Sequence, residues 1–152
     1  MNQSILRFLL SGALCLFCAG TMAEQSSTFG DYTVHYSAFT TDILTPEVAK
    51  AYGIQRSKSL ALLNISVLKK VMGTTGQPVR AKVQATATNL SAQLRQLNLR
   101  ELIDEQTDSK AIYYMAETTV ADGETLKFSI TVTPAESSAS TTVTFDQQFF
   151  TN

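Results

Sequence analysis

Alternation of apolar and polar residues runs through most of this chain and predicts β-strands. In the segment from Val79 to Thr88, apolar residues alternate strictly with Arg, Lys, Gln and Thr. The segments Phe29 to Phe39 and Thr141 to Phe150 show the same period of two, which turns one set of side chains toward a core and the other toward water. The segment Ser59 to Lys69 carries apolar residues on both faces, as is typical of a central strand.

Two strand-like runs joined by a turn occupy Ala111 to Pro134. The second run alternates four large apolar residues with Lys, Ser and Thr, and Asp122-Gly123 between the runs supplies residues that accept a positive φ. We predict that this stretch is a β-hairpin at the centre of one sheet.

One short helix is predicted from Pro46 to Tyr52. Thr45 offers an N-cap, proline occupies the first turn, and Gly53 follows where a helix would end. The segment Leu94 to Ile103 fits helical and strand spacing almost equally, and we predict a strand because it lacks helix caps and its neighbours are strands. The fold class is therefore all-β: an immunoglobulin-like antiparallel β-sandwich of about seven strands with one short helix.

The N-terminus has the pattern of a secretory signal peptide over residues 1–23. Arg7 precedes an apolar run of about a dozen residues, and Thr21-Met22-Ala23 resembles a cleavage site, so we expect cleavage after Ala23. A retained membrane anchor is the alternative, but the run is short of the roughly 20 residues of a spanning helix. Both cysteines lie in this segment, so residues 24–152 form a single disulfide-free domain with no stable membrane insertion.

Charge is segregated along the sequence, although the net charge is only −1. Residues 48–100 contain nine basic residues and no acid, whereas both flanks are acidic. One interpretation is that strands of the middle segment pair with strands of the flanks, so that opposite charges interleave. The other is a basic face for an anionic partner. The overall balance excludes a typical nucleic-acid binder.

Residues that could support catalysis or metal binding are few. His35 is the only histidine, and the alternation places it on the outer face of its strand, beside Thr33 and Ser37. No nucleophile motif accompanies it, so we expect no enzyme activity and no cofactor. The acidic residues between Glu101 and Asp108 lack the spacing of a calcium loop and fit a solvated turn better.

The loop after the predicted helix is the best candidate binding site. It offers Tyr52, Arg56, Ser57 and Lys58, with His35 as a further ligand if the fold brings it near. Arg56 and Lys58 would hold a carboxylate or phosphate. The alternative is a plain helix C-terminus, where Gly53 ends the helix and the cations interact with its dipole.

Two resemblances add to this interpretation. The run from Asp108 to Ala116 resembles the penultimate strand of immunoglobulin variable domains, with Tyr113 at the position of the tyrosine corner and Met115 in place of the cysteine. The chain as a whole resembles a bacterial family catalogued as domain of unknown function 4426. The likeness rests on Tyr32-x-Val34-His35-Tyr36-x-Ala38-Phe39, Pro46-x-Val48-Ala49-x-x-Tyr52-Gly53-Ile54-x-Arg56-Ser57-Lys58 and Leu63-Asn64-Ile65-Ser66-Val67. That resemblance implies a periplasmic location and a sandwich fold.

The sequence thus favours an exported, periplasmic, non-enzymatic interaction module. Its partner would be a protein or another envelope component, bound through an exposed strand edge or the loop after the helix. The alternative is a small anionic-ligand binder that uses that loop. The sequence does not specify the oligomeric state.

Overall fold

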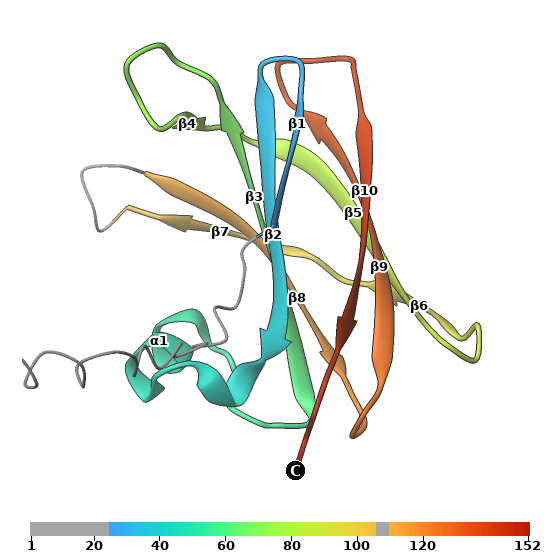
Figure 1. Cartoon of the computed structure of the whole chain (residues 1–152). Helices are drawn as coiled ribbons and strands as arrows, with labels where there is room; N and C mark the ends of the chain where they lie inside the picture. The colour runs from blue at the N-terminus through green and yellow to red at the C-terminus, as the bar shows by residue number, and fades with distance from the viewer. Residues whose placement is uncertain (1–24, 106–109) are drawn as a thin grey trace, which may run out of the picture.

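Two antiparallel β-sheets stacked face to face form the body of the protein (Figure 1). The computed structural model describes residues 25–105 and 110–152; the predicted signal peptide lies outside these ranges. The six-stranded sheet has the order β1 (Gln25–Phe29), β2 (Tyr32–Thr40), β3 (Leu60–Lys69), β8 (Ala111–Thr119), β7 (Arg100–Asp104), and β4 (Gln77–Pro78) also pairs with β3. The four-stranded sheet has the order β10 (Thr141–Gln148), β9 (Thr125–Pro134), β5 (Ala81–Asn89), β6 (Leu94–Leu97).

This architecture confirms the predicted all-β sandwich. The described residues form ten strands where the alternation predicted about seven. Two of the additional strands, β1 and β4, contain only five and two residues. The third arises because the segment Leu94 to Ile103 is divided: β6 belongs to one sheet and β7 to the other. The strand prediction for this segment is correct, but the change of sheet at Asn98 and Leu99 was not foreseen.

The main hydrophobic core lies between the sheets, on the inner face of each strand. On β3, Ala61, Leu63, Ile65 and Val67 are at most 1% exposed, and on β9 Leu126, Phe128, Ile130 and Val132 are fully buried. The Phe128 and Phe145 rings stack across neighbouring strands with their centroids 5.0 Å apart. The alternation in the sequence therefore identified the inner faces correctly.

The predicted hairpin from Ala111 to Pro134 is wrong. Its two arms, β8 and β9, lie in different sheets, so the connection at Asp122-Gly123 is an arch from one layer to the other (Figure 1). The arch is tied to both sheets: Val120 N–H donates to the Ser59 carbonyl before β3, and the Glu124 carbonyl accepts from Phe149 N–H after β10. Each arm occupies an interior position of its own sheet: β8 lies between β7 and the distant strand β3, and β9 lies between β10 and the distant strand β5.

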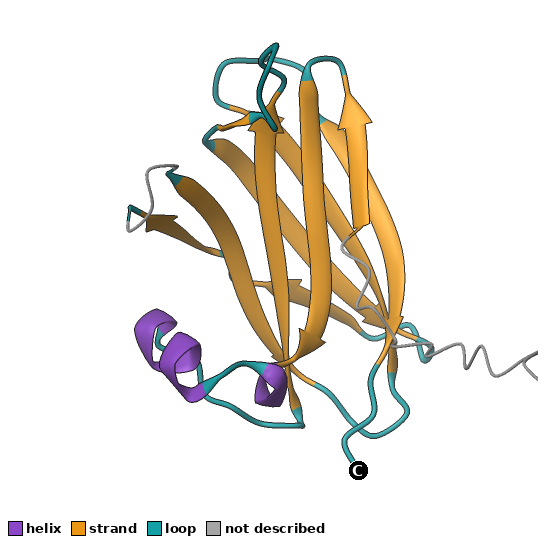
Figure 2. Cartoon of the chain, turned by 60° about the vertical axis from the view of Figure 1, so that its left-hand side comes forward, coloured by secondary structure: helices purple, strands orange, loops and turns teal. Residues whose placement is uncertain are grey.

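The short helix α1 (Pro46–Tyr52) has the predicted bounds. The Thr45 hydroxyl accepts a hydrogen bond from Val48 N–H at 3.3 Å, and Gly53 ends the helix with a φ of 63°. A 3₁₀ turn, η1 (Thr41–Ile43), precedes it. Figure 2 shows both helical segments at one end of the six-stranded sheet, outside the sandwich. Neither segment in the described ranges is long and apolar enough to cross a membrane.

Ion pairs connect the basic middle of the sequence to its acidic C-terminal part. Among the described residues, four pairs do so: Lys69–Glu136, Arg80–Glu101, Arg95–Glu124 and Arg100–Glu117, with N–O distances of 2.6 to 3.5 Å. Only Arg100–Glu117 joins two paired strands, β7 and β8, whereas the other three pairs each involve a residue outside the strands, Glu136, Arg80 or Glu124. Opposite charges therefore meet on the folded surface, as the first interpretation expected, but mostly through loops and not by strand pairing.

Candidate functional site

The loop between α1 and β3 is held to η1 by buried hydrogen bonds. The fully buried Thr41 hydroxyl donates to the Gln55 carbonyl at 2.7 Å and accepts from Ser57 N–H at 2.9 Å. The guanidinium of Arg56 donates to the Asp42 carbonyl at 2.9 Å. Two of the predicted binding residues, Arg56 and Ser57, therefore help to fix the loop in place.

The predicted site residues do not form one site. Lys58 is exposed, and the Ser57 hydroxyl lies 3.0 Å from that of Ser59. His35 lies opposite Ser66 in the β2–β3 ladder. The chain from Ser66 back to Ser59 is seven extended residues, about 23 Å. The structure therefore separates His35 from Arg56 and Lys58.

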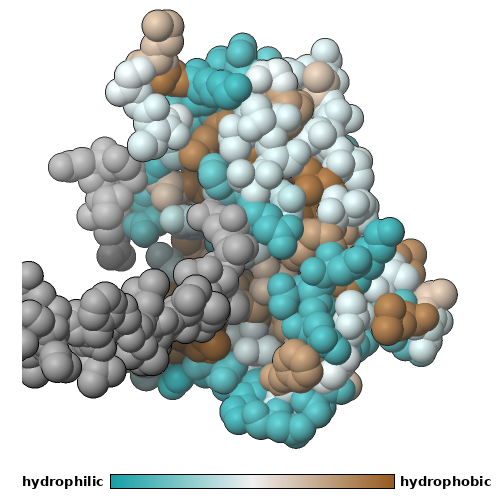
Figure 3. All heavy atoms as spheres, viewed as in Figure 1, coloured by the Kyte–Doolittle hydropathy of each residue, from teal (hydrophilic) through white to brown (hydrophobic). Residues whose placement is uncertain are grey.

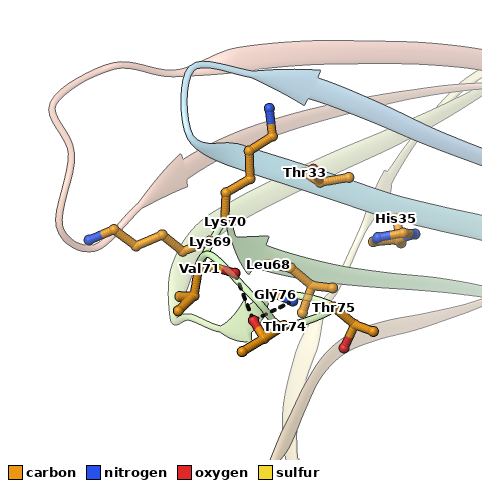
Figure 4. A pocket seen from close by; sticks show the side chains of 9 residues that line it. All are labelled: Thr33, His35, Leu68, Lys69, Lys70, Val71, Thr74, Thr75 and Gly76. Carbon is orange, nitrogen blue, oxygen red and sulfur yellow. Dashed lines mark hydrogen bonds between the residues drawn. The ribbon is translucent and has the colours of Figure 1, made fainter.

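His35 borders a hollow of about 120 Å³ at the other end of the six-stranded sheet (Figure 4). As predicted, it shares the outer face of β2 with Thr33, while the loop after β3 closes the other side. Lys69 and Lys70 also border this hollow, but Figure 4 shows their side chains extending away from it in different directions. The Lys69 ammonium is 2.7 Å from the Glu136 carboxylate, which raises the pKa of Lys69.

A larger hollow of about 580 Å³ lies beside β4 and contains both signs of charge. Lys69, Arg80 and Lys110 line it together with Glu105 and Glu136. Each of these cations has an acidic partner, at 2.7, 3.1 and 3.4 Å respectively. An anion entering this hollow would have to compete with carboxylates already in place.

Tyr52 belongs to a third pocket, of about 180 Å³, between α1 and the outer face of the six-stranded sheet. Phe39, Leu62, Asn64, Tyr113 and Met115 form the floor on β2, β3 and β8. Leu44, Val48, Tyr52 and Ile54 form the roof, which comes from α1 and its flanking residues. A second hydrophobic cluster surrounds this pocket, with Ile54, Leu62 and Met115 buried at its centre.

Sequence reasoning missed the floor of this pocket, although a signal was present. Leu62 lies on the face of β3 opposite to the main core, and it is only 2% exposed. An apolar residue on each face of a strand requires a cover on each side. The covering element here is the η1–α1 segment, which the sequence placed as a helix without assigning it to a face.

Two residues that line the pocket carry polar side-chain groups. The Tyr52 hydroxyl donates to Asp104 Oδ2 at 3.2 Å, which ties the end of α1 to β7. Burial, and then the Asp104 carboxylate, raise the pKa of Tyr52. The Asn64 side-chain oxygen is buried and has no hydrogen-bond partner among the described residues.

The predicted tyrosine corner is displaced by one residue. Tyr113 faces the pocket on the outer side of β8, whereas Tyr114 points into the sandwich and is 5% exposed. The Tyr114 hydroxyl accepts from Ala81 N–H on β5 at 2.8 Å and donates to Glu101 Oε2 at 3.1 Å. Tyr114 therefore joins the two sheets, and burial raises its pKa.

The edges of the two sheets differ in length and charge. In the six-stranded sheet, β1 and β7 are edges of five residues each, and β7 carries Arg100, Glu101 and Asp104. In the four-stranded sheet, β6 has four residues, whereas the edge strand β10 has eight and a single charge, Asp146. Within the described residues, β10 pairs only with β9, so its other side presents unpaired backbone groups.

Exposed large apolar side chains are scattered over the described structure, and the two most exposed lie on loops. Met72 in the loop after β3 is 101% exposed and Leu90 in the turn after β5 is 87% exposed. Figure 3 shows hydrophobic residues on two such projections, on an otherwise largely hydrophilic or intermediate face. Among the described residues, no group of three or more His, Cys, Asp or Glu side chains is arranged to hold a metal ion.

Known structures share this fold. A DUF4426 family protein from Pseudomonas aeruginosa PAO1 is 32% identical, with a TM-score of 0.69 over 85% of this chain and 96% of that one. FetP of uropathogenic E. coli strain F11, expressed recombinantly in the periplasm, is 11% identical, with a TM-score of 0.57 over 84% of this chain and 94% of that one. The comparison with curated proteins found no match. The model of a domain of unknown function, DUF4426, matches residues 26–152, and the chain therefore belongs to the DUF4426 family.

Proposed function

We propose that this protein is an exported, non-enzymatic interaction module that binds an extended segment of a partner protein at the outer edge of β10. The observation that carries the proposal is the open edge itself. β10 is the longest edge strand of the described structure, and its outer side has no strand partner there. Strand addition uses such an edge, because the partner's backbone completes the hydrogen bonds of the sheet.

The composition of β10 fits this role. Natural proteins protect edges with short strands, lysines, prolines or bulges. β10 has eight residues and carries neither lysine nor proline, and it pairs with β9 in unbroken register from Thr141 to Gln148. Its outward side chains include Thr142, Thr144 and Asp146, while Val143 and Phe145 anchor it in the core. The edge is therefore regular and largely polar, and the described residues provide no strand partner on its outer side.

Export is supported by the predicted signal peptide and by the periplasmic expression of FetP, which shares the fold. In the cell envelope, the unprotected edge of β10 would be available to extended segments of partner proteins. The alternative, an anion binder at the loop after α1, has less support. Arg56 donates to a backbone carbonyl, and His35 lies at the other end of the sheet.

Site-specific photocrosslinking in the periplasm tests the proposal. A photoreactive residue at Thr144 is expected to trap a partner, which mass spectrometry then identifies. Thr144→Lys should reduce copurification of that partner at least tenfold, because a lysine on an edge opposes strand addition. The control is Ser129→Lys: Ser129 is paired with Thr144 but lies on the interior strand β9.

Hydrogen exchange shows whether backbone pairing is involved. With the purified partner bound, amides of β10 should gain protection and those of β7, at an edge of the other sheet, should not. Failure to trap a protein in repeated trials would refute the proposal. So would equal loss of binding in the Thr144→Lys and Ser129→Lys variants.

A further inference from the structure

We propose that the segment bound at β10 has an alternating sequence, with β-branched or aromatic residues opposite Val143 and Phe145 and a lysine or arginine opposite Asp146. This inference rests on the proposed function, because it names the kind of partner segment that the open edge selects. It is carried by two further observations: the inner face of β1 is only partly covered, and the hydrogen-bond pattern of β10 determines which partner side chains face inward.

The six-stranded sheet extends one strand beyond the edge of the other sheet. The ring of Tyr36 on β2 lies 5.0 Å from the ring of Phe145 on β10, so β10 faces β2 across the core. β1 is the next strand beyond β2, whereas the described residues provide no strand beyond β10 (Figure 1). An extended segment added to β10 would therefore lie opposite β1 and continue the second layer there.

The inner face of β1 is less buried than that of its neighbour β2. Its inward residues, which pair with buried residues of β2, are Gln25, Ser27 and Phe29. Gln25 is exposed, and Ser27 and Phe29 are half-buried. Phe29 packs against the margin of the main core. Apolar side chains on the inward face of an added segment would bury this margin further, which favours binding.

The hydrogen bonds between β9 and β10 show which backbone groups of β10 remain open. Phe149 N–H donates to the Glu124 carbonyl at 2.9 Å, in the same register as the β9–β10 ladder. Hydrogen-bonded pairs alternate with non-bonded pairs along an antiparallel ladder, so Val143 and Phe145 also bond to β9. The backbone groups that point to the open side belong to the residues between and beside them, Thr142, Thr144 and Asp146.

Antiparallel addition then determines the pattern of the partner. Its residues opposite Thr142, Thr144 and Asp146 make the hydrogen bonds and turn their side chains to the outer face, where these three residues are exposed. Its residues opposite Val143 and Phe145 turn inward, toward β1. They form non-bonded pairs, in which the Cα atoms are only about 4.5 Å apart. Such close pairs favour β-branched and aromatic side chains.

Asp146 gives the segment a charge preference. It is the single charged residue of β10, it is exposed, and within the described residues no cation forms an ion pair with it. Lys127 of β9 lies opposite Asp146 on one side, and a residue of the added segment would lie opposite it on the other. A cation there is favoured, and an acidic residue would meet a like charge.

Titration of the purified protein with blocked synthetic pentapeptides, followed by amide NMR shifts, tests the inference. The sequence Lys-Val-Thr-Ile-Thr places lysine opposite Asp146 and both apolar residues inward. It should bind about fivefold more tightly than Lys-Thr-Ile-Val-Thr, which has the same composition without alternation, and than Glu-Val-Thr-Ile-Thr, which reverses the charge. The largest saturable shifts should fall on Thr142, Thr144 and Asp146.

A pair of variants isolates the charge contact. In Asp146→Asn the preference for the lysine peptide over the glutamate peptide should fall below twofold. Glu47→Gln is the matched control, because Glu47 is an exposed acid on α1, and it should leave the preference unchanged. An equal loss of preference in both variants would show that the effect comes from net charge and not from pairing with Asp146.

The inference and the proposed function fail in different ways. Equal binding of the three peptides, or no saturable binding of the alternating one, would overturn the inference. So would a partner, trapped by the photoreactive residue at Thr144, whose crosslinked segment does not alternate, although that result would support the proposed function. Failure to trap a protein at Thr144 refutes the function itself, whatever the peptides do.

Discussion

The two faces of the six-stranded sheet are buried to very different extents. Its inner face packs against the second sheet through β2, β3 and β8, and Val34, Ile65 and Val67 are completely buried there. Its outer face is covered only where η1 and α1 lie, and the cluster beneath them has three buried residues. Beyond the helix, His35 and its neighbours on the same face are partly exposed.

Because of this difference, the inner face holds most of the buried core, whereas the outer face stays partly accessible to solvent. The inner face is closed by the second sheet along β2 and β3, and the hollow of about 580 Å³ lies only at its margin, where Ile103 and Ile112 of β7 and β8 border it. Within the described residues, the apolar cover of the outer face comes from α1 and its flanking residues, and a gap of about 180 Å³ remains beside that helix. A seven-residue helix cannot cover a sheet of six strands, so the outer face keeps both a pocket and a solvated region. The predictions below test whether the two faces contribute to stability as unequally as their burial indicates.

The largest effect is expected at Phe128. Phe128→Ala removes a fully buried ring that contacts Phe145 and Phe149, with centroids 5.0 and 6.4 Å away. The free energy of unfolding should fall by about 3–5 kcal/mol in urea denaturation. Leu90→Ala, at a position 87% exposed, is the control and should change it by less than about 0.5 kcal/mol.

A smaller loss is expected on the outer face. Leu62→Ala removes a side chain that is 2% exposed, but part of its surroundings is the pocket and a short helix that can move inward. The free energy of unfolding should fall by about 2–3 kcal/mol, at the low end for buried leucines. A loss as large as that of Phe128→Ala would show that the two faces are equally important for stability.

The two adjacent tyrosines of β8 offer a matched comparison of the faces. Tyr114→Phe removes the hydroxyl that bonds to Ala81 and Glu101 inside the sandwich, and it should cost about 1–2 kcal/mol in the free energy of unfolding. Tyr113→Phe, on the outer face, should cost less than about 0.5 kcal/mol. The opposite ranking in thermal or urea denaturation would restore Tyr113 as the corner residue.

The cap of α1 is expected to contribute less. Thr45→Ala removes the hydroxyl that accepts from Val48 N–H at an exposed helix end, so the loss should be about 0.5–1 kcal/mol. Hydrogen exchange gives a sharper measurement: amides of α1 should exchange faster in the variant, while those of β3 and β9 should not change. A uniform acceleration would mean that α1 and the sandwich unfold as one unit.

The smallest effect is a dependence on alkaline pH. Burial raises the pKa of Tyr114 above the ordinary value of a tyrosine, which is about 10. The folded state therefore holds the phenol proton at a pH where the unfolded state has lost it, so the free energy of unfolding is constant in this respect below about pH 10 and falls as pH rises above it. Denaturation at pH 8 and pH 11 should show a smaller decrease for Tyr114→Phe than for the unchanged protein. An equal decrease would remove Tyr114 as its source.

Local features of the fold were predictable from the sequence. The strict alternation around Val79 to Thr88 marked β5, and the Thr45 cap, Pro46 and Gly53 gave the correct ends of α1. These features depend on residues close together in the chain. The family resemblance was also correct, since the family match covers residues 26–152.

The errors all concern which strands and side chains are neighbours in the folded protein. The turn at Asp122-Gly123 has hairpin residues, yet β8 pairs with β3 and β7, while β9 pairs with β5 and β10. Tyr113 matched the tyrosine-corner motif, yet the side chain that reaches the other sheet is that of Tyr114. The reason is that Tyr114 lies on the inner face of β8 and Tyr113 on the outer face. The predicted binding set combined His35 with Arg56 and Lys58. In the structure, His35 lies beside Ser66 on β3, so most of the length of β3 separates it from the two cations.

The sequence by itself determined which residues face a core, where the helix begins and ends, and that the domain is a disulfide-free β-sandwich. Those properties follow from a period of two and from capping chemistry, which act over a few residues. Only the tertiary structure decided which strands are neighbours, which edge stays open and where the pocket lies beneath α1. Backbone hydrogen bonds are the same for every strand, so the pairings between segments far apart in the sequence, β3 with β8 and β5 with β9, are chosen by packing, and no short pattern in the chain encodes them.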